Sequence, residues 1–201
     1  MSEGGYVHLR HNQVRDLEAK LLSEVCHDVV TEPVLLLLSG EQFRLASANR
    51  ADSARLDVSA RGVWRPMDKV FLDVRIFHPT ASSNGDSNNP FEKHEGEKKR
   101  SYNDRVIEVE KATFVPLVFS TTGAMGKEAT TYHKQLATLL SQKRNISYSD
   151  AMAYVRCRLR FCILKTTLVA LRGYRGSTSS GRSSMDSDIE IDLMPSESGY
   201  F

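Results

Sequence analysis

The chain has 201 residues, of which 40% are hydrophobic and 26% charged, and its formal net charge is +2. These values exclude a chain that is disordered or fibrous throughout, and they fit one globular domain with a core and a tail. Acidic residues gather after Ser177, where Arg182 is the single base, so the rest of the chain is basic. A basic body attracts polyanions moderately, but the same balance fits an ordinary basic domain equally well.

The cysteines and the apolar runs bear on the compartment. Cys26, Cys157 and Cys162 have no metal-ligand spacing, and we expect reduced, packed thiols. No signal peptide opens the chain, and the apolar run at 34–38 is far shorter than a membrane span. The sequence therefore predicts an intracellular protein that makes no membrane contact.

The N-terminal part predicts a loop over residues 1–10 and an amphipathic helix over 12–29. Asn12 is a good cap, and the apolar positions follow a 3.6-residue period (Val14, Leu17, Leu21, Leu22, Val25 and Val29). Glu18 projects into this apolar face, and Glu24 lies at its edge. Each carboxylate either reaches solvent or points into a cleft and adds an acid to a site. Capping is the simplest account of the polar residues His11, Asn12 and Arg15.

The segment from Arg55 to Pro79 predicts two β-strands joined by a turn, with Asp57 in the first apolar run and Asp73 in the second. Because side chains alternate along a strand, Asp73 and Arg75 fall on one face, opposite to Leu72, Val74 and Ile76. Burying such charges costs several kcal/mol unless they are paired or bind a metal. Two aspartates on neighbouring strands could hold one divalent cation. The alternative is a solvated charge pair on the open face of an ordinary sheet.

The other elements are simpler to predict. Residues 34–38 form a short strand or an apolar loop, 42–54 are irregular, and Trp64 packs at the turn between the two strands. A low-complexity mobile loop at 80–89 precedes a charged helix at 92–111. An interior strand follows at 114–120, where Pro116 demands a bulge or an unpaired edge. Two helices, at 127–144 and 148–171, close the domain; the second is a core helix with a basic outer rim.

This order of elements predicts an α/β domain with a mixed sheet. We divide the chain into an N-terminal loop (1–10), an α/β domain (11–174) and a disordered Ser-rich acidic tail (175–201). Walker and GxGxxG phosphate loops are absent, and so is the GxSxG motif of a serine hydrolase.

The arrangement of acids resembles the PD-(D/E)XK, or restriction-endonuclease-like, superfamily, which has an αβββαβ core. The match is Leu56-Asp57, then fifteen residues, then Asp73-Val74-Arg75. More specifically, residues 4–174 look like the segment downstream of the reverse transcriptase in animal non-LTR-type retroelements. The matching stretches are GGYVHLRHNQVRDLEAKLLSEVCHDV, ARLDVSARGVW, FLDVRIFHP, KKRSYNDRVIEVE and FVPLVFSTTGAMGKEA.

This resemblance implies a metal-dependent DNA endonuclease, either active or degenerate. It implies that Asp57 and Asp73, with Glu24, hold Mg²⁺ or Mn²⁺, and that Lys98 or Lys99, together with Arg75, neutralises the scissile phosphate. DNA would contact Arg100, Tyr102, Arg156, Arg158 and Arg160. The chain departs from the family pattern at Leu56, where proline is usual, and at Arg75, where lysine is usual. Arginine does not deprotonate in a protein, so it stabilises charge but cannot act as a base.

Two other functions remain open at this stage. One is a non-catalytic nucleic-acid-binding module on the same fold. The other is a protein-interaction domain with a regulatory acidic tail, whose serines at 177–187 would gain charge on phosphorylation. The resemblance also implies a reverse transcriptase as partner in a larger element, and a nuclear location if the target is chromosomal DNA.

Overall fold

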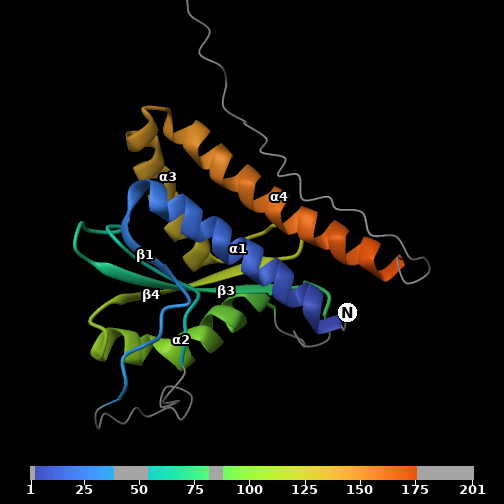
Figure 1. The fold of residues 1–201 in the computed structure, drawn as a ribbon, viewed down its shortest axis with the longest axis horizontal. Helices are drawn as coiled ribbons and strands as arrows, with labels where there is room; N and C mark the ends of the chain where they lie inside the picture. Colours follow the sequence, from blue (N-terminus) through green and yellow to red (C-terminus); the bar gives the residue numbers. More distant parts are fainter. Residues whose placement is uncertain (1–2, 39–53, 82–87, 176–201) are drawn as a thin grey trace, which may run out of the picture.

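The computed structural model describes residues 3–38, 54–81 and 88–175. Within these ranges the elements are α1 (Glu3–Val25), β1 (His27–Thr31), β2 (Val58–Arg61), β3 (Lys69–Phe77), α2 (Pro90–Glu108), β4 (Thr113–Ser120), α3 (Lys127–Arg144) and α4 (Tyr148–Arg175). Figure 1 shows how the helices lie on the two sides of the sheet.

The four strands form one mixed sheet in the order β1-β2-β3-β4. The pairs β1–β2 and β2–β3 are antiparallel, whereas β3 and β4 are parallel. A parallel pair needs a long crossover, and here α2 supplies it between β3 and β4. The predicted α/β fold with a mixed sheet is therefore confirmed.

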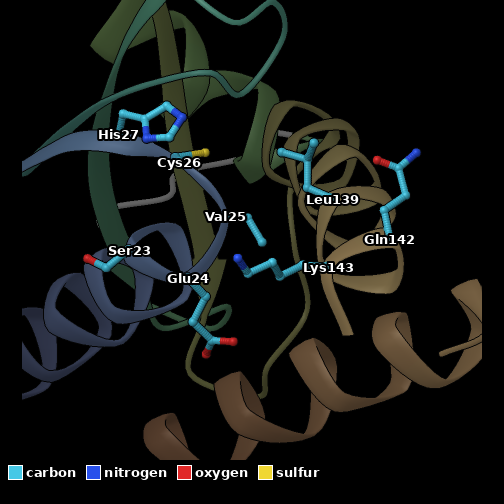
Figure 2. Close-up of a pocket in the computed structure, with 8 residues that line it drawn as sticks. All are labelled: Ser23, Glu24, Val25, Cys26, His27, Leu139, Gln142 and Lys143. Atoms are coloured by element: carbon cyan, nitrogen blue, oxygen red, sulfur yellow. The ribbon is translucent and has the colours of Figure 1, made fainter. Parts of the chain in front are cut away.

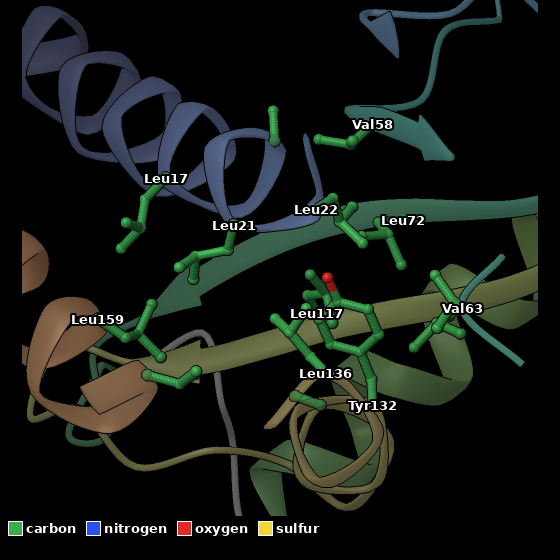
Figure 3. Packing of buried hydrophobic residues seen from close by; sticks show 14 of the residues in the cluster. Leu17, Leu21, Leu22, Val58, Val63, Leu72, Leu117, Tyr132, Leu136 and Leu159 are labelled. Atoms are coloured by element: carbon green, nitrogen blue, oxygen red, sulfur yellow. The ribbon is translucent and has the colours of Figure 1, made fainter. Parts of the chain in front are cut away.

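Each face of the sheet has its own apolar core. Side chains from α1, α3 and α4 pack with the sheet in the larger core (Figure 3), which includes Leu21, Leu22, Leu72, Leu117, Leu136 and Leu159. The smaller core lies on the α2 side and contains Leu35, Leu56, Phe71, Val106 and Phe114. Because both faces are covered, β3 and β4 read as near-continuous apolar runs in the sequence.

Pro116 fits the sheet because β4 is an edge strand. β4 pairs with β3 alone, and Pro116 lies opposite Asp73 in that pairing. A proline has no N–H to donate, so it is tolerated where one side of the strand has no neighbour. The predicted unpaired edge is confirmed.

The N-terminal loop predicted for residues 1–10 is wrong for the described residues, because α1 begins at Glu3. Gly4 and Gly5 each cost about 1 kcal/mol relative to alanine in a helix interior, but they lie in the first turn, whose N–H groups have no intrahelical partner in any case. Glu3, an acid at the N-terminus of the helix, also favours an early start.

The first strand of the sheet differs from the prediction. α1 ends at Val25 rather than Val29, and the chain then forms β1 over His27–Thr31. Asp28 and Glu32 have positive φ angles of 51° and 52° at either end of this strand. Residues 34–38 contribute only the bridge between Val34 and Arg55. The helical periodicity therefore led to a predicted helix that extends into β1, because this short, exposed strand has little apolar pattern of its own.

The remaining predicted elements agree with the structure. The charged helix and the last two helices correspond to α2, α3 and α4, and the strand predicted at 114–120 is β4, which is buried but lies at the edge of the sheet rather than in its interior. α4 buries Val155, Leu159 and Ile163 and exposes Arg156 and Arg160, which confirms a core helix with a basic rim. Of the cysteines, Cys157 is exposed rather than packed. The predictions for 42–53, for most of the 80–89 loop and for the tail after Arg175 fall outside the described residues.

A carboxylate from α2 caps the start of α3. Glu95 Oε1 accepts a hydrogen bond of 3.0 Å from the backbone N–H of Glu128, in the first turn of α3. The N-cap residue Gly126 offers no side-chain cap, and a Cβ there would collide with Glu95 Oε1. A negative charge at the N-terminus of α3 also interacts favourably with the dipole of that helix.

Candidate functional site

Asp57 and Asp73 are neighbours across the sheet. Val58 of β2 pairs with Leu72 of β3 in an antiparallel register, so the next step places Asp57 opposite Asp73. Directly opposite residues of such a pair point to the same face. Along β3, Leu72 and Val74 join the α1-side core, while Phe71 joins the α2-side core. Asp73 therefore points to the α2 side, as its alternation with Leu72 and Val74 predicts.

The Asp57 side chain takes the place of a missing stretch of strand. β2 begins at Val58, so β3 has no β2 neighbour beyond Leu72. There Asp57 Oδ2 accepts a hydrogen bond of 2.5 Å from the backbone N–H of Val74. Its own N–H donates to the Leu72 carbonyl at 3.0 Å. These bonds fix the carboxylate at the point where the two strands part.

Two basic side chains reach the aspartates from two different helices. His11 of α1 lies with Nε2 3.2 Å from Asp57 Oδ2. Lys98 of α2 lies with Nζ 2.6 Å from Asp73 Oδ2, and its ammonium is 5.9 Å from the ring centroid of Tyr102. We call His11, Asp57, Asp73 and Lys98 the carboxylate cluster.

The two carboxyl groups titrate differently. Burial raises the pKa of Asp73, the nearby charge of Asp57 adds to the rise, and Lys98 opposes it, which leaves a pKa of about 6. Burial also acts on Asp57, but hydrogen bonds from His11 and Val74 outweigh it and hold that pKa below its ordinary value. The bond to Asp57 raises the pKa of His11. One carboxylate thus stays ionised while its neighbour exchanges a proton near neutral pH, a pairing suited to acid–base chemistry.

His11 was not predicted as a site residue. The sequence placed it in a polar group with Asn12 that capping explained, and its ring does lie 3.4 Å from the Asn12 side chain. Since α1 begins at Glu3, His11 lies well inside the helix rather than at its cap. The nine residues by which α1 extends beyond the predicted start, about two and a half turns, therefore change the role of His11, and the sequence carries no signal for them beyond the polarity of His11 itself.

The structure places the other predicted catalytic and metal-binding residues in separate ion pairs. Arg75 pairs with Glu97 at 2.8 Å, and Lys99 pairs with Glu128 at 2.5 Å. Glu24 pairs with Arg144 at 2.6 Å. Glu24 follows His11 by thirteen residues of α1, which is about 20 Å along the helix axis, so the fold does not bring it to the aspartates.

The residues predicted to contact DNA lie on two different helices. Arg100 and Tyr102 belong to α2, and the Tyr102 ring packs 5.8 Å from that of Phe114. Arg156, Arg158 and Arg160 belong to α4, which packs on the other face of the sheet (Figure 1). The Arg160 stem lies over Gly123, in the loop that follows β4. No common surface of these five residues follows from the fold.

A second polar group lies in the larger core, and little in the sequence points to it. Glu18 of α1 is fully buried, with Oε1 2.8 Å from Nε2 of His133 on α3. His133 Nδ1 lies 2.7 Å from the Ala129 carbonyl, which can only accept, so Nδ1 carries a proton. Tyr132 donates its hydroxyl to Glu18 Oε2 at 3.3 Å. We call Glu18, Tyr132 and His133 the core cluster.

The core cluster holds charge away from water. Burial lowers the pKa of His133, but the attraction and hydrogen bond of Glu18 outweigh it and leave the pKa raised. Burial and the Glu18 charge raise the pKa of Tyr132 well above its ordinary value. The expectation that Glu18 either reaches solvent or enters a cleft is wrong, because it is paired inside the core. A buried carboxylate persists when it is paired and hydrogen bonded in this way.

A shallow pocket lies between the end of α1 and α3 (Figure 2). Its volume is about 540 Å³, and it is lined by Ser23, Glu24, Val25, Cys26, His27, Leu139, Gln142 and Lys143. Burial raises the pKa of the Cys26 thiol to about 11, so this sulfur is a poor nucleophile at neutral pH. The pocket contains no member of the carboxylate cluster.

No protein-family model matches the chain, and neither does any curated protein. Among the described residues, no group of three or more His, Cys, Asp or Glu side chains is arranged to hold a metal ion. No helix in the described part of the chain has the length and apolarity needed to cross a membrane.

Proposed function

We propose that this chain is a metal-dependent DNA endonuclease domain of restriction-endonuclease-like fold, derived from a non-LTR-type retroelement. The observation that carries the proposal is the carboxylate cluster. Asp57 directly precedes β2, Asp73 lies in β3, the two carboxyl groups interact with each other, and Lys98 reaches Asp73 from the next helix at 2.6 Å. The order helix, three antiparallel strands, helix and parallel strand is that of the family that the sequence resembles.

The donor set fits a hard divalent cation. Asp57 and Asp73 offer carboxylate oxygens, which Mg²⁺ and Mn²⁺ prefer. Two protein ligands suffice for Mg²⁺, which usually keeps several waters and binds substrate phosphate. When bound, the metal would supply an activated water and charge stabilisation at the phosphate. Asp57, held by Val74, would orient the site, and Asp73 would lose its proton as the cation enters.

Lys98 is the cation best placed to meet a scissile phosphate. It lies at the cluster, whereas Arg75 and Lys99 are held by Glu97 and Glu128. An ammonium close to the reacting phosphate stabilises the charge that develops there. Lys98 thus takes, from the helix, the role that the family assigns to a lysine at the position of Arg75.

The test is a plasmid-nicking assay with Mg²⁺ or Mn²⁺. Wild-type protein should nick, and Asp73→Asn should slow nicking by about 100-fold or more, because the loss of a positioned catalytic group costs that much. Asp68→Asn, in the exposed turn before β3, is the matched control and should leave the rate unchanged. Equal nicking by the Asp73 variant would trace the activity to a contaminant or to another site.

One observation favours a second candidate, a non-catalytic nucleic-acid-binding module on the same fold. The two acids are already compensated by His11 and Lys98, and Arg75 cannot serve as a base. In this case the protein would bind DNA with a log affinity that falls with log salt concentration, and no metal would produce cleavage. An affinity that does not change with salt would remove this candidate. In either case DNA is the proposed partner, the rest of the element would supply the reverse transcriptase, and the place of action would be the nucleus.

A further inference from the structure

The outward face of α4 carries an apolar stripe that no described element covers. Cys157, Phe161, Leu164 and Leu168 are spaced four, three and four residues apart, so they share one side of the helix. Phe161, Leu164 and Leu168 are 54%, 52% and 46% exposed. Val155, Leu159 and Ile163 are buried on the opposite side. We call these four outward residues the α4 stripe; a contiguous exposed patch of this kind marks an interaction surface.

The margins of the α4 stripe are basic. Arg156 and Arg160 are exposed along one margin, and Lys165 is exposed along the other. The sequence from Ala151 to Arg175 contains no Asp or Glu at all. A ligand for this face therefore needs apolar side chains for the stripe and acidic side chains for its margins.

We propose that the α4 stripe binds the acidic segment 186–194 of the same chain. This segment, which lies outside the described residues, reads DSDIEIDLM. Acids at 186, 188, 190 and 192 alternate with Ser187, Ile189, Ile191 and Leu193. An alternating sequence can present its apolar residues on one side and its acids on the other. Both chemical requirements of the α4 stripe are met in one short stretch.

The length of the chain permits this contact. Ten residues, 176–185, separate the end of α4 from the acidic segment, and they span up to about 35 Å when extended. Leu164 lies eleven residues before Arg175, or about 16 Å back along the helix axis. The segment can therefore reach the stripe on its own helix. Tethering also gives it an effective concentration on the order of millimolar, so a weak contact is enough.

Two other occupants fit less well. A second copy of α4 would bring Arg160 and Lys165 against the same basic residues, and like charges across an interface disfavour pairing. An anionic membrane surface would satisfy the basic margins. The acidic segment of the same chain, however, is repelled by anionic lipid and therefore weakens the attraction of the protein to such a surface. Both remain distinguishable outcomes of the experiment below.

The experiment is zero-length carbodiimide cross-linking of the full chain, which joins a carboxylate to a lysine in contact. An equal mixture of ¹⁴N and ¹⁵N protein is treated, and the linked peptides are identified by mass spectrometry. We expect Lys165 to link to the acids at 188–192 within one chain, with isotopically pure products. Exposed Lys134 of α3 gives the background yield. Raising the salt concentration should lower the Lys165 yield, because exposed charges are screened.

Variants on both sides of the contact sharpen the result. Phe161→Ser with Leu164→Ser should reduce the Lys165 yield by about tenfold, since the apolar contact is lost. Ile189→Ser with Ile191→Ser should do the same from the other side, in a part of the chain outside the described fold. Ile107→Ser is the control. It replaces an apolar side chain of similar exposure, 51%, on α2 rather than on the α4 stripe, and it should leave the Lys165 yield unchanged. Mixed-isotope products, a Lys165 yield no higher than that of Lys134, or insensitivity to both double variants would each overturn the proposal. Flotation with anionic vesicles that is unchanged when the acids are neutralised would point to a membrane surface instead, and would overturn it as well.

Discussion

The carboxylate cluster and the core cluster contain the same kinds of groups, yet they stand in opposite relations to water. In the core cluster, Glu18 and His133 have side-chain exposures of 0% and 1%. In the carboxylate cluster, His11 and Lys98 keep 31% and 23%, so solvent reaches the charges that flank Asp57 and Asp73. Both clusters draw on α1, which contributes Glu18 to one and His11 to the other.

The difference separates a structural ion pair from a candidate site. In the core cluster, each charged atom already has a partner, and nothing can exchange with solvent. In the carboxylate cluster, His11 and Lys98 are partly exposed, so the groups that pair with Asp57 and Asp73 can exchange with solvent. A perturbed pKa is therefore a functional sign only where exchange is possible.

The largest effect should follow from leaving one buried charge unpaired. His133→Leu or Glu18→Leu alone should lower the free energy of unfolding by about 3 to 5 kcal/mol, because the remaining charge is stranded in the core. The double substitution should recover most of this loss. Urea denaturation followed by circular dichroism measures all three variants. Single variants that lose less than about 1 kcal/mol would show that water reaches the pair after all.

The next effect concerns the pH dependence that Asp73 gives to stability. Its pKa of about 6 in the folded state is above the ordinary value of 3.8, so its contribution is present below pH 3.8 and lost as the pH rises through 6. Asparagine does not ionise, so the Asp73→Asn variant does not lose this stability as the pH rises. Relative to wild type, the variant should gain on the order of 2 to 3 kcal/mol of unfolding free energy between pH 4 and pH 7. Denaturant curves of variant and wild type at both pH values measure this gain. If the difference between the two proteins were the same at pH 4 and at pH 7, the pKa of Asp73 would lie near its ordinary value.

A smaller effect isolates the cation at the carboxylate cluster. Lys98→Met removes the ammonium that opposes the rise in the Asp73 pKa, so that pKa should move further upward by about one unit or more. Lys99→Met is the matched control, because Lys99 pairs with Glu128 instead. Carboxyl ¹³C chemical shifts followed over a pH titration report both values. An unmoved Asp73 pKa in the Lys98 variant would mean that the ion pair does not persist in solution.

The smallest effect is expected for the pair of Arg75 and Glu97. Their side chains are 36% and 35% exposed, and such pairs contribute about 0.2 to 1 kcal/mol. Arg75→Gln should therefore change the unfolding free energy by less than about 1 kcal/mol. The same variant in the nicking assay tests whether Arg75 contributes at all to the proposed reaction. A loss of stability as large as that of the His133 variant would place Arg75 in an essential network.

The sequence predicted the fold well where the pattern was long and periodic. α3 was expected at 127–144 and has those bounds, and β3 was placed from its β-branched run. β1 was not predicted, because its five mostly exposed residues have no periodic pattern and the predicted helix extended into them. The start of α1 escaped because two glycines resemble a loop, although near a helix end they cost little.

The candidate site was predictable only in part. Asp57, Asp73 and Lys98 were named from charge within apolar runs and from the family resemblance, and the structure brings them together. His11 and His133 were missed because partner residues distant in the sequence define their roles. Glu18 and Glu24 looked alike on one helix, but six residues separate them, and one meets His133 while the other meets Arg144. Periodicity describes a face of a helix, not what lies against it.

The carboxylate of Glu95 at the start of α3 bears on how Lys98 is held. α2 and α3 pack on opposite faces of the sheet, yet Glu95 and Lys99 of α2 both bind Glu128, one through its backbone and one through its side chain. These residues flank Lys98 along the same helix. The stretch of α2 that carries Lys98 is thus joined to the first turn of α3, and a side chain added at Gly126 would have to displace the Glu95 carboxylate from that joint.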